Sequence, residues 1–267
     1  MKIVTIALMC LPSMAAGSAI SWQAGGAPPN PQIAIASQLV SNDPVQQSRA
    51  LLAVETMDQS TLGDDVKAAL ATALQQESRR NTRRYWQNRA GQALEPLPDP
   101  ELMAHLSRVV AELHDPRTIP ALAESLGVGS PAIRTLAGFG ELAAPAVLDV
   151  VMSPASTHYA IDQGLIALRF MVEASRTGHR LSPSILERIG HAAEYHLTHR
   201  PRFIFTVWRA IDLAVTLQDP RLRTIVQAFA SGPQPATAMG ATDSDDLERT
   251  QKKALDGLAG VPPLPRP

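Results

Sequence analysis

The chain repeatedly places a proline, in most cases after an Asp or a Ser, directly before a short segment of helical apolar periodicity. Asp and Ser cap the free N–H groups of a first helical turn, and proline fits the first helical position. The spacings between Pro116, Pro145, Pro183 and Pro220 are 29, 38 and 37 residues. Periods of this size are typical of helical repeat arrays. The dipeptides are Asp43-Pro44, Asp99-Pro100, Asp115-Pro116, Ser130-Pro131, Ala144-Pro145, Ser182-Pro183 and Asp219-Pro220.

The pattern is clearest between Leu113 and Val151. Two apolar stripes lie there at helical spacing, and glycines separate them. Short amphipathic helices are marginal alone and must bury such stripes against neighbours. We therefore expect pairs of short helices that pack against one another. The stripes are Ile119, Leu122, Ala123 and Leu126, then Ala132, Ile133, Leu136 and Ala137.

The Asp-Pro start, the segment AIRTLAGFG at 132–140 and the segment APAVL at 144–148 resemble the HEAT-like repeats of the phycobilin-lyase type. The resemblance covers about 40 residues. It implies stacked helical hairpins and usually a binding surface, but no single chemistry. The expected fold is all-α: a right-handed α-solenoid of stacked antiparallel helix pairs.

The first residues have the order of a secretory signal peptide. Lys2 precedes an apolar run at 3–11, and small residues follow Pro12. We expect cleavage near 17–19 and a secreted or periplasmic protein. The alternatives are a buried first helix and a lipoprotein attached at Cys10. The run is too short for a bilayer span, which takes about 20 apolar residues.

The net charge of −1 gives no whole-molecule attraction to nucleic acid or anionic lipid. Removing the signal would also remove Cys10, the only cysteine, and with it any disulfide or thiol chemistry. The expected organisation is a signal peptide at 1–19, an irregular leader at 20–33, an N-terminal helical hairpin and linker at 34–98, a HEAT-like repeat array at 99–231, a loop at 232–242 and a C-terminal capping helix at 243–260.

Polar side chains recur on the helices that should line the concave face of such an array. One interpretation is a mixed-charge groove for a peptide or protein, and the other is a ladder of salt bridges between repeats. Alternation of both signs favours the ladder. Phe203 and Trp208 are possible exposed anchors, but an aromatic content of 4% favours core positions. The concave-face candidates are Arg134, Asp162, Arg169, Arg176, Arg209 and Asp212.

A second candidate is the segment 79–89, where arginines surround Tyr85 and Trp86. Arginines interleaved with aromatic residues can bind phosphate and stack bases. The alternative is a solvated extension of the helix at 64–78 that ends at Gly91. Like charges at i,i+4 weaken a helix, so this alternative requires partner carboxylates. The anion-binding candidates are Arg79, Arg80, Arg83 and Arg84.

A third candidate is the helix that carries His191, Glu194, His196 and His199. The spacing differs from HExxH, in which two histidines share one helix face. A HEAT-type hydroxylase family holds two irons with His-Glu dipeptides, and this sequence contains none. We expect an exported scaffold for protein or peptide binding, without catalysis, cofactor, metal, nucleic acid or membrane span. The alternatives are a metal-dependent enzyme using His191–His199 and an anion or nucleic-acid binder using Arg79–Arg89.

Overall fold

The computed structural model describes residues 30–94, 100–128, 130–178 and 180–260. Within these ranges every regular element is an α-helix or a short 3-10 helix, and no strand occurs. The all-α expectation is confirmed. The predicted signal peptide at 1–19 lies outside the described residues.

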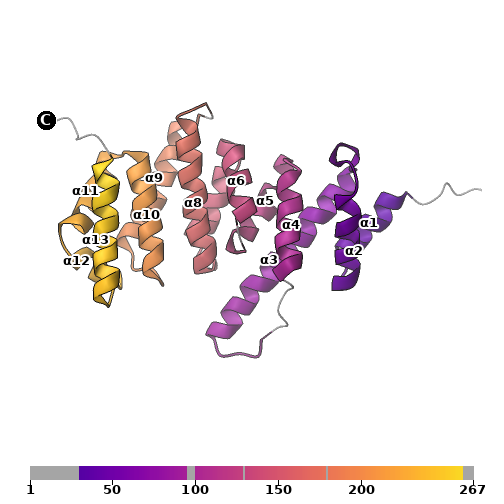
Figure 1. Ribbon diagram of the computed structural model, residues 1–267, viewed down its shortest axis with the longest axis horizontal. Helices are drawn as coiled ribbons and strands as arrows, with labels where there is room; N and C mark the ends of the chain where they lie inside the picture. Colours follow the sequence, from indigo (N-terminus) through magenta and orange to yellow (C-terminus); the bar gives the residue numbers. More distant parts are fainter. Residues whose placement is uncertain (1–29, 95–99, 129, 179, 261–267) are drawn as a thin grey trace, which may run out of the picture.

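The helices follow one another with short connections (Figure 1). The first half contains α1 (Pro31–Leu39), α2 (Pro44–Glu55), α3 (Asp64–Arg89), α4 (Pro100–Glu112), α5 (Ile119–Glu124), α6 (Ser130–Phe139) and α7 (Ala144–Met152). The second half contains α8 (His158–Ser175), α9 (Pro183–Thr198), α10 (Ile204–Leu217), α11 (Pro220–Ser231), α12 (Gln234–Ala238) and α13 (Ser244–Ala259). Short 3-10 helices lie at Gln59–Thr61, Pro116–Thr118, Ser125–Gly127 and Gly140–Leu142.

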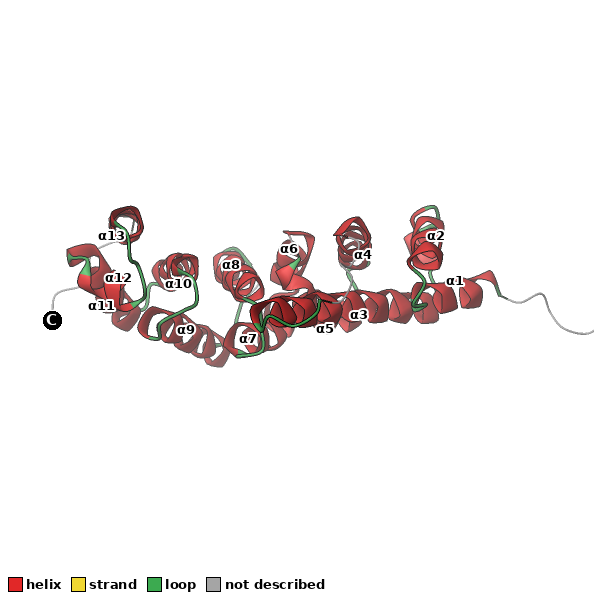
Figure 2. Cartoon of the chain, turned by 90° about the horizontal axis from the view of Figure 1, so that it is seen from below, coloured by secondary structure: helices red, strands yellow, loops and turns green. Residues whose placement is uncertain are grey.

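The helices form two rows along the long axis of the molecule (Figure 2). One row contains α1, α3, α5, α7, α9 and α11, and the other contains α2, α4, α6, α8, α10 and α13. Packing is serial: α8 lies against α6, α7 and α10, and α10 lies against α8, α9 and α13. The first row bends gently, and the second row lies on the inner side of the bend (Figure 2).

The predicted Asp-Pro starts cap their helices. The carboxylates of Asp43, Asp115 and Asp219 each accept a hydrogen bond from the backbone N–H two residues later, at 2.9, 2.9 and 2.7 Å. After Asp115 the first turn is a 3-10 helix, and the α-helix begins at Ile119. Ser182 occupies the cap position of α9 without such a bond.

The predicted apolar stripes form the core. Leu122, Leu126 and Leu136 are fully buried, as are Leu165 and Leu168 on α8. The buried residues make one continuous cluster from the first described helix to the last. Each short helix therefore gains its stability from its neighbours, as its length requires.

Three features of the expected organisation differ in the structure. The leader at 20–33 overlaps α1, because the Asn30 side chain accepts from the N–H of Gln32 at 3.0 Å and starts a helix at Pro31. The N-terminal unit therefore has three helices instead of one hairpin. The expected loop at 232–242 contains the short helix α12, which buries Ala236.

Among the described residues, no single helix is both long and apolar enough to span a bilayer. The pair Pro131–Leu142 and Ala144–Met152, bent by 117° at its break, meets the length and composition requirement only when its two parts are taken together.

Candidate functional site

In Figure 1 the second half of α3 crosses α4 diagonally and extends to the lower edge of the array. The Tyr85 hydroxyl hydrogen-bonds to Nδ1 of His158 at 2.9 Å, on the first turn of α8. The indole Nε1 of Trp86 donates to the carbonyl of Ala155 at 2.9 Å. The helix at 64–78 does continue to Arg89, as predicted. Its two aromatic residues are half-buried contacts with α8 and the loop before it.

The arginines of this segment have partners within the chain. Arg79 makes two hydrogen bonds of 2.7 Å to the carboxylate of Glu124, and Arg80 lies 2.9 Å from Glu77. The expected partner carboxylates are therefore present. Burial raises the pKa of Glu77, and the charge of Arg80 opposes that shift. Arg83 and Arg84 also interact within the chain. Anion binding by these four arginines stays a prediction.

Beside this crossing lies a cavity of about 330 Å³, which we call the edge pocket. It is bounded by the loop before α8, the start of α8, the end of α9 and the loop before α10. Its described lining includes two arginines and three histidines but no Asp or Glu. The lining residues are Val151, Met152, Ser153, Pro154, Ser156, His158, Ile161, Tyr195, His196, His199, Arg200, Pro201, Arg202 and Thr206.

Aromatic rings lie in and beside the edge pocket. Tyr195 belongs to the lining, stacks on His199 at 4.2 Å and is 41% exposed, so apolar surface remains open to a ligand. Tyr159 and Phe203 lie outside the lining and contact the His158 ring, with centroid distances of 3.8 and 4.1 Å. A cavity with this aromatic rim can hold an apolar group and a polar group together.

Burial favours the neutral form of His158 and His196. Burial lowers the pKa of His158, and Arg89 and Arg202 lower it further. Burial also lowers the pKa of His196, whose Nε2 lies 3.1 Å from the Val151 carbonyl and must donate to it. The fixed positive charge of the lining therefore comes from its two arginines.

The nearest acidic groups are engaged elsewhere. The Asp162 carboxylate accepts from the Thr206 hydroxyl at 2.6 Å behind the pocket wall, and burial raises the pKa of Asp162. Glu194 lies 3.1 Å from Arg221 on α11. Neither carboxylate neutralises the arginines of the pocket.

The histidine helix does not bring its three histidines to one point. His191 lies 3.7 Å from Glu187 and 3.9 Å from Glu194, whereas His196 is buried and His199 stacks on Tyr195. Across the described ranges, no group of three or more His, Cys, Asp or Glu residues is placed to hold a metal ion. The geometry gives the metal-enzyme alternative no site on this helix.

The concave-face candidates on α8 and α10 form a charge ladder. Arg169 lies 3.4 Å from Glu173 and 3.9 Å from Asp212. Asp212 also lies 4.0 Å from Arg209 and 2.7 Å from Lys253 of α13. These ion pairs connect three successive helices of the inner row and agree with the ladder interpretation.

The remaining concave-face candidates differ in their surroundings. Asp162 is buried, Arg176 donates to the Thr216 carbonyl, and Arg134 is exposed on α6. Partner binding by this face stays a prediction. Of the two aromatic anchors, Trp208 is half-buried and donates to the Thr250 hydroxyl at 2.7 Å, but Phe203 is exposed. The preference for a core position is therefore wrong for Phe203.

Sequence reasoning missed Tyr159, Arg200 and Arg202. Arg200 and Arg202 belong to the segment HRPRF at 199–203, where basic and aromatic residues alternate in the connection between two helices. The same signal drew attention to 79–89 and was present here too. The structure places both segments at one edge of the array, since Arg202 lies over the Trp86 ring at 4.0 Å.

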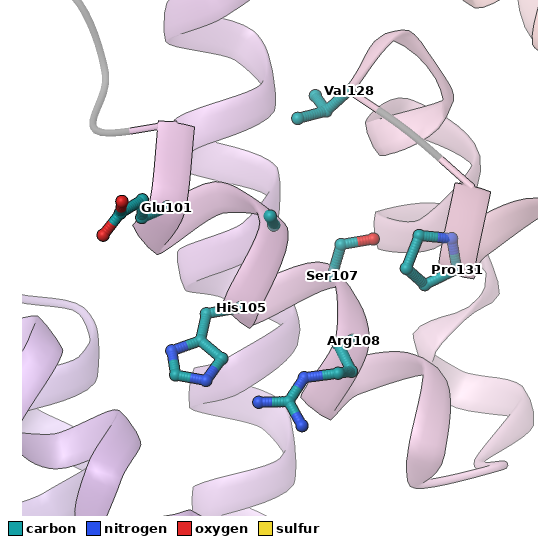
Figure 3. A pocket seen from close by; sticks show the side chains of 7 residues that line it. Glu101, His105, Ser107, Arg108, Val128 and Pro131 are labelled. Carbon is teal, nitrogen blue, oxygen red and sulfur yellow. The ribbon is translucent and has the colours of Figure 1, made fainter.

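A larger cavity of about 620 Å³ lies between α4 and α6 (Figure 3). Its charged groups are paired: His105 and Arg108 contact Glu55 at 2.8 and 2.5 Å. The buried Ser107 hydroxyl has no hydrogen-bond partner and is directed toward Pro131 (Figure 3). Because its charges are satisfied by α2, we consider the edge pocket the better candidate site.

Comparison with known proteins adds little. No protein-family model and no curated protein sequence matches the chain. Among solved structures, human deoxyhypusine hydroxylase in complex with glycerol is similar with a TM-score of 0.24 and 11% identity, over 86% of this chain and 96% of that one. A TM-score this low says nothing about fold or activity.

Proposed function

We propose that this chain is an exported scaffold that binds a protein or peptide partner at the edge pocket and catalyses no reaction itself. Its architecture would be a right-handed α-solenoid of HEAT-like helix pairs. The serial packing of two helix rows and the resemblance at 132–148 support that architecture. The order of residues 1–19 supports export.

One observation carries the binding proposal. The edge pocket combines the exposed ring of Tyr195 with two arginines and has no acidic residue in its described lining. Aromatic residues and arginine are enriched among the residues that dominate the energy of protein interfaces. The charge ladder of the inner row, in contrast, is neutralised by its own ion pairs.

Hydrogen bonds from α3 and buried residues of the core hold the walls of the edge pocket in place. Two hydrogen bonds from α3 hold the loop before α8, and Val151 and His196 are buried in its wall. A loop that is anchored in this way loses little conformational entropy when a ligand binds. This rigidity is what a recognition surface requires.

The test is a selection of random displayed peptides on the purified chain, followed by affinity measurements on two variants. Tyr195→Ala removes the exposed ring that lines the pocket. Leu255→Ala removes a comparably exposed apolar side chain on α13 and serves as the matched control. We expect Tyr195→Ala to weaken binding by about tenfold or more, as a side chain at an interface centre does, and Leu255→Ala to leave it unchanged.

Two results would contradict the proposal. A selection that enriches no peptide would remove the binding function. Peptides that bind the Tyr195→Ala chain as tightly as the original would move the site away from the edge pocket. Circular dichroism of both variants checks that the helices remain intact.

A further inference from the structure

We infer that the edge pocket recognises the free C-terminal carboxylate of a peptide, together with an apolar or aromatic last side chain. The inference rests on the proposed function and names the part of the partner that is read.

Arg202 is held in place by an aromatic ring. Its guanidinium lies over the face of Trp86 at 4.0 Å, and Trp86 is fixed by its bond to the Ala155 carbonyl. Within the described chain, no carboxylate forms an ion pair with Arg202. Stacking occupies the face of a guanidinium and leaves its N–H edge open, and this edge matches a carboxylate in a bidentate geometry.

Arg200 supplies a second positive charge in the connection between α9 and α10, two residues before Arg202. Its guanidinium runs beside the backbone of Gly240, where a Cβ would lie 3.1 Å from Nε of Arg200. Gly240 also has a φ of +99°, which residues with a side chain rarely adopt. Both this backbone conformation and the close approach of Arg200 disfavour a larger residue at position 240. Arg200 lines the pocket, and its guanidinium packs against the backbone of Gly240, which lies outside the lining.

Apolar surface completes the pocket. Val151, Ile161 and Pro201 contribute aliphatic atoms, and the Tyr195 ring lies along one side. A volume of about 330 Å³ is at the small end of ligand pockets, which span about 300–1,000 Å³. This space suits one terminal residue better than a nucleotide or a large cofactor.

The charge of the pocket favours one carboxylate over a polyanion. Burial favours the neutral imidazoles of His158 and His196, so two arginines provide the fixed charge. Proteins that bind nucleic acid neutralise many phosphates and usually carry a basic surface. This chain has a net charge of −1. A single carboxylate fits that balance.

The experiment uses pools of short fluorescent peptides that differ at the last residue, each made with a free C-terminal carboxylate and as the C-terminal amide. Fluorescence anisotropy measures their binding to the full chain, to Arg202→Gln and to Arg249→Gln, an exposed arginine on α13 that serves as the control. We expect pools ending in apolar or aromatic residues to bind, and their amides to bind at least about tenfold more weakly. Arg202→Gln should reduce binding of the free acids to the level of the amides, and Arg249→Gln should not.

Three outcomes overturn the inference. Equal binding of acids and amides removes the carboxylate from the recognition, although peptide binding and the proposed function then stand. If acids and amides bind equally tightly and millimolar inorganic phosphate abolishes the binding of both, the arginines recognise a phosphate ligand instead. Failure of every pool, with or without the amide, removes the inference and the proposed function together.

Discussion

Replacing Gly164 by alanine should destabilise the chain, although alanine normally stabilises a helix. Gly164 lies in α8 where that helix meets α7, and a Cβ there would lie 2.5 Å from Cγ2 of Val151. Two carbon atoms prefer a separation of about 3.5–4.0 Å, so the overlap is about 1 Å. Overpacking of this kind costs about 1–3 kcal/mol, whereas the gain in helix propensity is about 1 kcal/mol. The expected net loss is about 1 kcal/mol of unfolding free energy.

The matched control is Gly138→Ala in α6. A Cβ at Gly138 would meet no atom within 4 Å, so only the gain in helix propensity remains. This variant should be more stable by about 0.5–1 kcal/mol. Urea unfolding followed by far-UV circular dichroism measures both changes from the shift in midpoint at constant slope.

A third variant isolates the contact. Shortening Val151 to alanine in the Gly164→Ala chain removes the Cγ2 atom that the new methyl group meets. A double-mutant cycle should therefore give a favourable coupling of about 0.5–3 kcal/mol between these two positions. If Gly164→Ala and Gly138→Ala change stability in the same direction, or if the coupling is zero, then α7 and α8 do not touch as described and the serial packing argument fails.

Three further predictions concern pH, charge and export. Burial lowers the pKa of His196, so the unfolded chain binds a proton at this residue more readily than the folded chain does. The free energy of unfolding therefore falls as the pH drops below about 6.5. Urea unfolding of His196→Gln should show a shallower fall of stability with pH, and an unchanged dependence on pH would contradict this prediction. Asp212→Asn removes partly exposed ion pairs and should lower stability by about 1 kcal/mol or less, with a smaller effect in high salt; a larger loss or one that salt does not change would contradict the ladder. N-terminal sequencing of the protein recovered outside the cytoplasm should begin just after 17–19, and retention of Met1 there would contradict the signal peptide.

Local chemistry made the helices predictable from the sequence. Capping at Asp43, Asp115 and Asp219 acts over two residues, and the apolar stripes repeat within one helix. Such local signals can be read from the sequence without knowledge of the rest of the fold. α1 was missed because its only fully buried residue is Leu39, so its sequence has little of the periodicity that marks the other helices.

The edge pocket was not predictable as a site, because its parts come from distant segments. Tyr85 and His158 are 73 residues apart in the chain, and their contact depends on how far α3 runs past its neighbours. The position of Phe203 has a simpler explanation. Phe203 stands at the cap before α10, one residue ahead of the stripe in which Ile204 and Val207 are buried, and so its ring remains outside the core.

The two basic and aromatic segments at 79–89 and 199–203 meet at one place, which neither segment indicates alone. The contact between them places both segments at the edge pocket. The aromatic residues of 79–89 support the site, because Arg202 stacks on the ring of Trp86. The arginines of 199–203 line the cavity. Trp86 and Tyr85 thus support the wall of the edge pocket, and anion binding by the arginines of the same segment stays a prediction.

Hydrogen exchange of the full chain, with and without a saturating selected peptide, tests the central claim most directly. Binding at the edge pocket should slow exchange of backbone amides at 151–161 and 195–206 and leave α2, α4 and α6 unchanged. Protection confined to the inner row of helices, with no change at 151–161 and 195–206, would place recognition on the concave face and contradict the account.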